Sequence, residues 1–217
     1  MDATYDLQDA FYVPLGSGGD IDRPGPQVEI WKLRNYSNHQ KREQSTHTAF
    51  AQAYVRGATD AIGKQEYMLA LELSSRALSL DPNSANAFYA AALTHHINGY
   101  LTKAALLYEK QLDLGEDAAV LMNLAMIHEK NGDSEKQAEA LQRAVAAAPW
   151  LYEPLHRLVV FLRRQGQYDR ALTLLRQHGE SFIQRTAFYQ DLELVHTANG
   201  DANAARAARL QAERIGH

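Results

Sequence analysis

Histidine is the residue type in this 217-residue chain that most readily suggests metal binding or acid–base catalysis, and the chain contains nine. Three of them, His95, His128 and His196, recur at the same position of a repeated pattern. Equivalent positions in stacked repeats are separated by two helix–helix distances of about 8–10 Å each, whereas a shared metal needs ligand bonds of about 2 Å. We therefore expect these histidines to pack within the fold rather than to form a metal or catalytic site.

Other sequence signatures of catalysis are incomplete or absent. The glycine-rich stretch LGSGGD at residues 15–20 lacks the Gly-Lys-Ser/Thr ending of a phosphate loop. The sequence contains no Gly-x-Ser-x-Gly element of a hydrolase nucleophile. The absence of cysteine excludes disulfides, thiolate metal sites and cysteine catalysis. We predict that the protein is not an enzyme and uses neither a cofactor nor a metal.

Charge and hydropathy argue against two further classes of partner. The 22 basic and 26 acidic residues give a net charge of -4, so no strong basic field is available to bind nucleic acid or an anionic membrane. No apolar run is long enough to span a bilayer, so we expect no membrane insertion. The N-terminal residues lack the basic and apolar regions of a signal peptide, and both a cytoplasmic and a periplasmic location stay open.

The elements that must position any site are shown by a repeat. Gly99, Gly132, Gly166 and Gly200 follow one another at spacings of 33, 34 and 34 residues, and Gln65 lies one period of 34 before Gly99. A fixed period in this range indicates stacked supersecondary units. Each period contains two amphipathic helical patterns joined by a turn, so we predict five helix pairs. The first helices are expected at 47–62, 85–98, 118–131, 152–165 and 186–199, and the second helices at 66–79, 101–113, 134–147, 168–178 and 202–214.

Small residues recur on the second helix of each period. Ala70 and Ala77 are seven residues, or about two turns, apart and therefore share one helix face. Small side chains at such positions let neighbouring helices approach closely. The recurring set is Ala70, Ala77, Ala104, Ala144, Ala171, Ala205 and Ala212.

The pattern resembles the tetratricopeptide repeat family. The match is closest between Tyr54 and Pro82, and departures include Ser74, Gln111 and Gln137, where the family prefers other residue types. The resemblance implies an all-α, helix–turn–helix solenoid of about five repeats in residues 46–217. Residues 1–45 lack a helical period and are expected to form an extended, non-helical N-terminal arm. The matching residues are Tyr54, Gly57, Ala58, Tyr67, Ala70, Ala77 and Pro82.

The resemblance also implies a site, because in this family the first helices line a concave groove that binds peptides or helices. Methionine adapts its shape to another chain, and Asn123 can both donate to and accept from a peptide backbone. Glu153 occupies a position where some family members hold a C-terminal carboxylate, and its charge would repel that group. The expected partner-binding residues are Tyr89, Leu93, Met122, Asn123, Met126, Arg157 and Val160.

The expected arm carries two apolar clusters separated by a Gly/Pro-rich spacer. A purely solvated tail would not carry such residues, so some surface should receive them: the groove, the first repeat or another protein. The arm could also support a homo-oligomer. We expect Trp31 to pack against the first repeat near Tyr54. The arm anchors are Phe11, Tyr12, Val13, Ile30 and Trp31.

Three functional hypotheses remain at this point. The first is a non-catalytic adaptor or scaffold that binds a segment of a protein partner in its groove, within a bacterial multiprotein assembly or secretion system. The second is a structural subunit anchored in a larger complex through its N-terminal arm. The third, an enzyme or sensor domain, is disfavoured because the sequence shows no ligand cluster and no paired carboxylates with a supporting base.

Overall fold

The computed structural model describes the backbone of residues 26–216 and the side chains of residues 45–216. The chain separates into two compact units, Met1–Ser45 and Thr46–His217, and the second unit contains the repeats. Within the described residues all regular secondary structure is α-helical. None of the helices in this part of the chain has the length and apolar character that crossing a bilayer requires.

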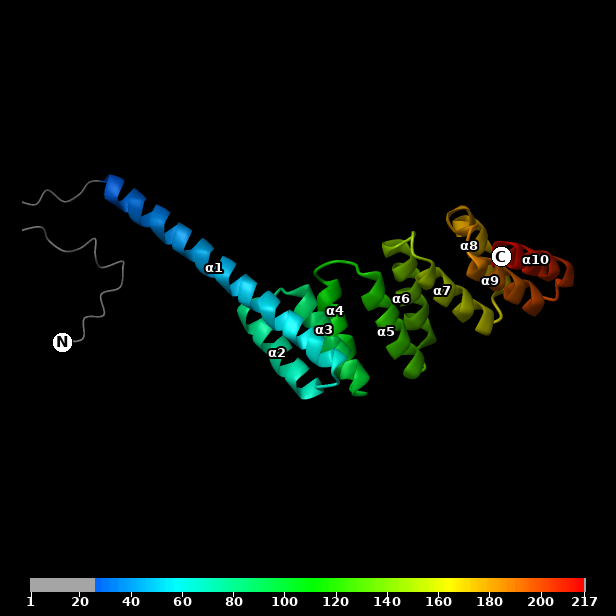
Figure 1. Cartoon of the computed structure of the whole chain (residues 1–217), viewed down its shortest axis with the longest axis horizontal. Helices are drawn as coiled ribbons and strands as arrows, with labels where there is room; N and C mark the ends of the chain where they lie inside the picture. The colour runs from blue at the N-terminus through cyan, green and yellow to red at the C-terminus, as the bar shows by residue number, and fades with distance from the viewer. Residues whose placement is uncertain (1–25, 217) are drawn as a thin grey trace, which may run out of the picture. The chain divides into compact units, whose positions relative to one another are not determined.

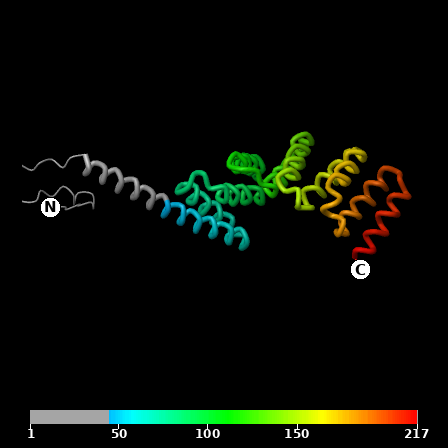
Figure 2. Tube along the Cα trace, turned by 90° about the horizontal axis from the view of Figure 1, so that it is seen from above, coloured from blue at the N-terminus to red at the C-terminus, as the bar shows by residue number. Residues whose placement is uncertain are grey.

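The helices of the repeat domain follow one another in chain order (Figures 1 and 2). Odd-numbered helices are the first members of the pairs and even-numbered helices are the second members. The described helices are α1 (Pro26–Gly63), α2 (Tyr67–Leu80), α3 (Ala85–Ile97), α4 (Leu101–Leu112), α5 (Ala118–Lys130), α6 (Ser134–Ala147), α7 (Tyr152–Arg164), α8 (Tyr168–Phe182), α9 (Thr186–Ala198) and α10 (Ala202–Gly216).

The five predicted helix pairs are confirmed, but the first helix begins much earlier than expected. The prediction of a non-helical arm was wrong for residues 26–45, because α1 already begins at Pro26. Proline is favoured at the first position of a helix, and no glycine or proline follows it before Gly57. The proposed anchors Phe11, Tyr12 and Val13 lie outside the described residues. Ile30 and Trp31 belong to α1, but their side chains lie outside the described ones, so their docking stays a prediction.

The second boundary that differs from the prediction is the end of α8, expected at residue 178 and found at Phe182. Gly179 is buried inside this helix, and a β-carbon built there would lie only 3.3 Å from Cζ of Phe188 on α9. The glycine therefore does not end the helix. It permits the close approach of a neighbouring aromatic ring, which offsets its poor helix propensity.

The turns within the helix pairs share one backbone conformation, which explains the spacing of the glycines. Gly99, Gly132, Gly166 and Gly200 all have φ between 70° and 81°, a region that favours glycine. In the first pair the same position is taken by Gln65, with a φ of 62°. The residue after each of these positions donates its amide to the carbonyl five residues earlier, as in the Schellman motif at helix ends.

Packing of small residues holds the pairs together. Ala70, Ala77, Ala104, Ala144 and Ala171 are all fully buried, as the repeat predicts. The main apolar core runs without interruption through the second to the fifth pair, and consecutive helices contact one another from α2 to α10. These pairs therefore share one core, because a single pair could not bury its apolar face alone.

Replacing Ala171 with leucine is expected to destabilise the repeat domain by about 1–3 kcal/mol, because the larger side chain overpacks a fully buried position. The measurement is urea-induced unfolding followed by circular dichroism. Ala146→Leu is the matched control, since Ala146 is exposed on α6. Equal stability of the Ala171 variant and the wild type would show that the helices are not closely apposed at this position.

Candidate functional site

The predicted partner-binding residues lie on α3, α5 and α7, and all seven are half-buried. Tyr89, Asn123 and Arg157 are spaced by 34 residues and so occupy equivalent positions in successive repeats. The next equivalent position is Asp191 on α9. We call the surface formed by Tyr89, Leu93, Met122, Asn123, Met126, Arg157 and Val160 the odd-helix surface.

An aromatic cluster supports the α3 part of the odd-helix surface. The ring of Tyr89 lies 6.1 Å from that of Tyr108 on α4, and the ring of His96 lies 6.2 Å from Tyr108 on another side. Burial raises the pKa of Tyr108, and the neighbouring Tyr89 adds to this shift while Asn123 opposes it. Tyr108 therefore stays neutral, and this wall of the surface carries no charge.

The middle of the odd-helix surface is also neutral. Helix α3 contains no Asp, Glu, Lys or Arg, and α5 contains them only in its last turn, at Glu129 and Lys130. Met122 and Met126 lie in the uncharged part of α5 and are half-buried. Unbranched methionine side chains can change rotamer to fit another chain, so this region is suited to apolar side chains of varied shape.

The charge expected from Arg157 is neutralised within its own helix. The Arg157 Nε atom lies 2.7 Å from Oε1 of Glu153, one helical turn earlier, and both side chains are substantially exposed. Such a pair contributes only a few tenths of a kcal/mol to stability. The pair offsets the charge of Arg157, while Arg163 and Arg164 lie in the last turn of α7, where Arg164 pairs with Glu129.

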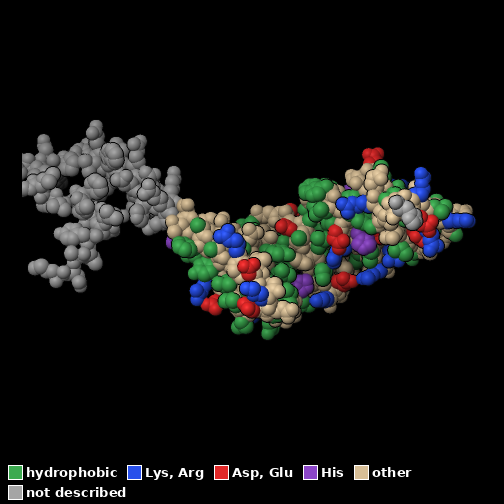
Figure 3. All heavy atoms as spheres, in the orientation of Figure 1, with side chains coloured by type: hydrophobic (Ala, Val, Ile, Leu, Met, Phe, Trp, Pro, Cys, Tyr) green, Lys and Arg blue, Asp and Glu red, His purple; other side chains and the backbone are tan. Residues whose placement is uncertain are grey.

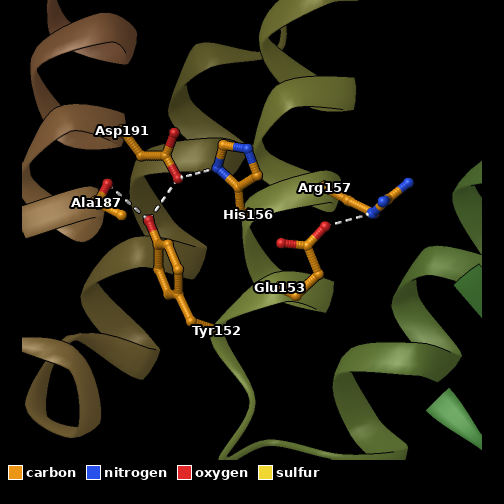
Figure 4. A network of polar contacts seen from close by, with 6 residues as sticks. All are labelled: Tyr152, Glu153, His156, Arg157, Ala187 and Asp191. Atoms are coloured by element: carbon orange, nitrogen blue, oxygen red, sulfur yellow. Dashed lines mark hydrogen bonds and ion pairs between the residues drawn. The ribbon is translucent and has the colours of Figure 1, made fainter. Parts of the chain in front are cut away.

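A buried carboxylate joins α7 to α9 at the end of this surface (Figure 4). The Tyr152 hydroxyl lies 2.5 Å from Oδ2 of Asp191, and Nδ1 of His156 lies 2.7 Å from the same oxygen. The Tyr152 hydroxyl also lies 3.0 Å from the carbonyl oxygen of Ala187. Glu153 and Arg157 lie on the other side of α7. Tyr152, His156 and Asp191 together are called the carboxylate network below.

The carboxylate network is buried at Asp191 and accessible to solvent at His156. Asp191 is buried, whereas the side chain of His156 is 41% exposed. Burial raises the pKa of Tyr152, and the hydrogen bond to Asp191 raises it further. Tyr152 is therefore neutral and donates its proton to the carboxylate. This satisfies part of the hydrogen-bonding need of a charge that would otherwise be costly to bury.

Tyr152, His156 and Asp191 fall within the first helices expected at 152–165 and 186–199, but the sequence does not connect them. Tyr152 and His156 are four residues apart and share a helix face, while Asp191 is 35 residues after His156. The sequence alone shows that Tyr152 and His156 share a helix face. It does not show that both contact Asp191, because that contact depends on how α7 and α9 pack.

The histidines of the repeated position lie apart from one another, at the ends of separate helices. The ring of His95 packs 6.0 Å from that of Tyr100, and burial lowers the pKa of His95. His196 lies 3.8 Å from a carboxylate oxygen of Asp201, beyond hydrogen-bonding distance. The described residues contain no group of three or more His, Cys, Asp or Glu side chains that could hold a metal ion.

Tyr152→Phe is expected to lower the free energy of unfolding by about 1.5–3 kcal/mol, because it removes a hydrogen bond to a buried charged group. Chemical denaturation measures the change. Tyr100→Phe serves as the control, since Tyr100 is 59% exposed and its hydroxyl has no hydrogen-bond partner among the described residues. A loss no larger than that of the control would mean that Tyr152 does not support Asp191.

Comparisons with known proteins show one matching family model and several solved structures of the same fold. The tetratricopeptide repeat family model matches residues 118–149, which contain α5 and α6. No curated protein matches the chain. Among solved structures, YrrB, described as a tetratricopeptide-repeat protein with an unusual peptide-binding site, is 22% identical, with a TM-score of 0.59 over 75% of this chain and 84% of its own.

Two further solved structures have the same fold. MamA is 18% identical and has a TM-score of 0.64 over 76% of this chain and 91% of its own. PilF of Pseudomonas aeruginosa is 16% identical and has a TM-score of 0.64 over 79% of each chain. These likenesses confirm the predicted architecture. The chain carries a tetratricopeptide repeat at residues 118–149, and its repeat domain is a tetratricopeptide-repeat solenoid.

Proposed function

We propose that this protein is a non-catalytic adaptor that binds a segment of a partner protein along the odd-helix surface. The observation that carries the proposal is the combination of partial exposure and neutrality on α3 and α5. Tyr89, Met122 and Met126 remain half-exposed although the even-numbered helices pack against the rest of the domain. Water must be displaced from these side chains for the apolar surface to contribute to binding.

The partner segment should offer apolar side chains to α3 and α5 rather than a cluster of charges. Figure 3 shows acidic and basic side chains interspersed on the visible face of the described residues rather than gathered in one patch. Arg157 is paired with Glu153. Long-range attraction of a charged partner is therefore weak, and binding should depend little on salt.

The structural comparisons support the same kind of role. YrrB is described as having a peptide-binding site, and PilF comes from a bacterium. By analogy we propose that the present chain acts in a bacterial multiprotein assembly, with a protein or peptide as its partner. The analogy concerns fold and interaction type, because the identities are too low to transfer a particular partner.

A second role follows from the sequence of the N-terminal region. Phe11, Tyr12 and Val13 form an apolar cluster that a solvated tail would not retain. These residues could anchor the chain in a larger complex or join two copies of it. In that case, association would depend on this cluster and not on the odd-helix surface.

Met126→Glu is expected to weaken peptide binding roughly tenfold or more, because it places an unpaired charge in an apolar contact. The measurement is selection of a displayed random-peptide library on the immobilised full chain, followed by affinity determination for the enriched peptides. Met68→Glu is the matched control, since Met68 is 81% exposed on α2. Circular dichroism checks that both variants keep their helicity.

The proposal is contradicted if no enriched peptide distinguishes the Met126 variant from the wild type. Combined Phe11→Ala and Tyr12→Ala substitution separates the second role. If this double variant loses association with a partner or with itself while Met126→Glu does not, the N-terminal cluster is the principal contact.

A further inference from the structure

The carboxylate network ends in a histidine nitrogen with no partner in the described part of the chain. The His156 ring uses Nδ1 to contact Asp191, and its other nitrogen, Nε2, makes no hydrogen bond to any described residue. The Asp191 side chain is only 4% exposed, whereas that of His156 is 41% exposed. The ring therefore connects a buried charge to the surface at the α7 end of the odd-helix surface.

The chemistry of Asp191 determines which ring nitrogen carries hydrogen. An ionised carboxylate can only accept hydrogen bonds. Its Oδ2 atom is contacted by the Tyr152 hydroxyl at 2.5 Å and by His156 Nδ1 at 2.7 Å, so both of these groups must donate. In the neutral imidazole one nitrogen is a donor and the other is an acceptor. A hydrogen on Nδ1 therefore leaves a lone pair on Nε2.

We propose that Nε2 of His156 accepts a hydrogen bond from an N–H group of the bound partner segment, with Asp191 and Tyr152 as positioning residues. This inference rests on the proposed function, because it assigns a polar contact to the segment that lies along the odd-helix surface. The apolar contacts on α3 and α5 accept many sequences. One fixed acceptor on α7 adds a directional requirement, which fixes the register of the segment.

The surrounding charges favour an N–H donor over an anion. Asp191 lies directly behind the ring, and Glu153 lies one turn from Arg157 and pairs with it. Arg185 lies over the ring of Phe182, 5.8 Å from its centroid. The charge of Arg185 also acts on Tyr152, but an unprotonated Nε2 has no hydrogen to donate to a carboxylate. A backbone amide, or the N–H of a lysine, arginine, asparagine or glutamine, matches an acceptor backed by negative charge.

The first test needs no ligand. Nitrogen-15 NMR of the full chain at pH 7.5 should show the His156 ring protonated at Nδ1 and unprotonated at Nε2. His156→Phe identifies the signals. Asp191→Leu should abolish the preference for Nδ1, because the acceptor is lost while Tyr152 can still donate to the carbonyl of Ala187. Protonation at Nε2 in the wild type, alone or together with Nδ1, would overturn the inference.

The second test uses peptides from the displayed library that bind the wild type and lose affinity for the Met126→Glu variant. His156→Phe should weaken their binding about 3- to 10-fold, the effect of one hydrogen bond. His128→Phe, which alters a half-buried histidine in the last turn of α5, should leave binding unchanged. If peptides of this class bind the His156 variant as tightly as the wild type, the inference fails and the proposed function stands.

A modified-peptide series identifies the donor. Each backbone N–H of one such peptide is methylated in turn, and each side chain with an N–H group is replaced by an isostere without it. One modification should weaken binding to the wild type but have little further effect on His156→Phe, as a double-mutant cycle requires for two groups in contact. Fully additive effects at every position would show that His156 makes no such bond. The complete absence of Met126-dependent peptides would instead overturn the proposed function and this inference together.

Discussion

Close approach between helices at fully buried alanines is the constraint on which this structure depends. Ala70, Ala104 and Ala171 on the second helices have no solvent-accessible surface. A larger side chain at these positions would push the helices apart. Two glycines extend the same principle. A β-carbon at Gly57 would lie 3.2 Å from Leu73 and one at Gly179 would lie 3.3 Å from Phe188, so each neighbouring side chain would have to shift slightly. Each helix pair is thereby held at a spacing that lets the next pair pack on it.

Stacking at this spacing also creates the surface to which the proposed function is assigned. The even-numbered helices use their small residues to pack, so the larger residues of the odd-numbered helices remain partly uncovered. Tyr89, Met122 and Met126 are half-buried for this reason. Where the next odd-numbered helix comes close enough, as α9 does to α7, the equivalent position is buried instead. Asp191 occupies that position, and its charge requires the donors that Tyr152 and His156 supply.

The odd-helix surface therefore has two chemically different parts. Along α3 and α5 it is uncharged and adaptable, which suits apolar side chains but distinguishes poorly between sequences. At α7 it carries a compensated ion pair and a histidine held by a buried carboxylate. A directional group held in place costs little conformational entropy on binding. Affinity and specificity would thus come from different repeats of the same solenoid.

The sequence by itself determined the period, the number of helix pairs and most helix ends. The turn glycines indicate the period in the sequence, because a positive φ is needed wherever the same turn recurs. Gln65 occupies the equivalent turn position in the first pair. Local patterns misplaced two boundaries. Helix α1 begins at Pro26, where no amphipathic pattern predicts a helix. Helix α8 continues through Gly179, where the ring of Phe188 packs.

Tertiary structure alone decided the carboxylate network. The partners of Asp191 lie 35 and 39 residues earlier, and their meeting depends on the distance and rotation between α7 and α9. The pairing of Arg157 with Glu153 is local by contrast, because residues four apart on a helix are neighbours. Periodicity identifies which residues share a helix face. The packing of one helix against another decides which of those faces become buried and which remain available to a partner.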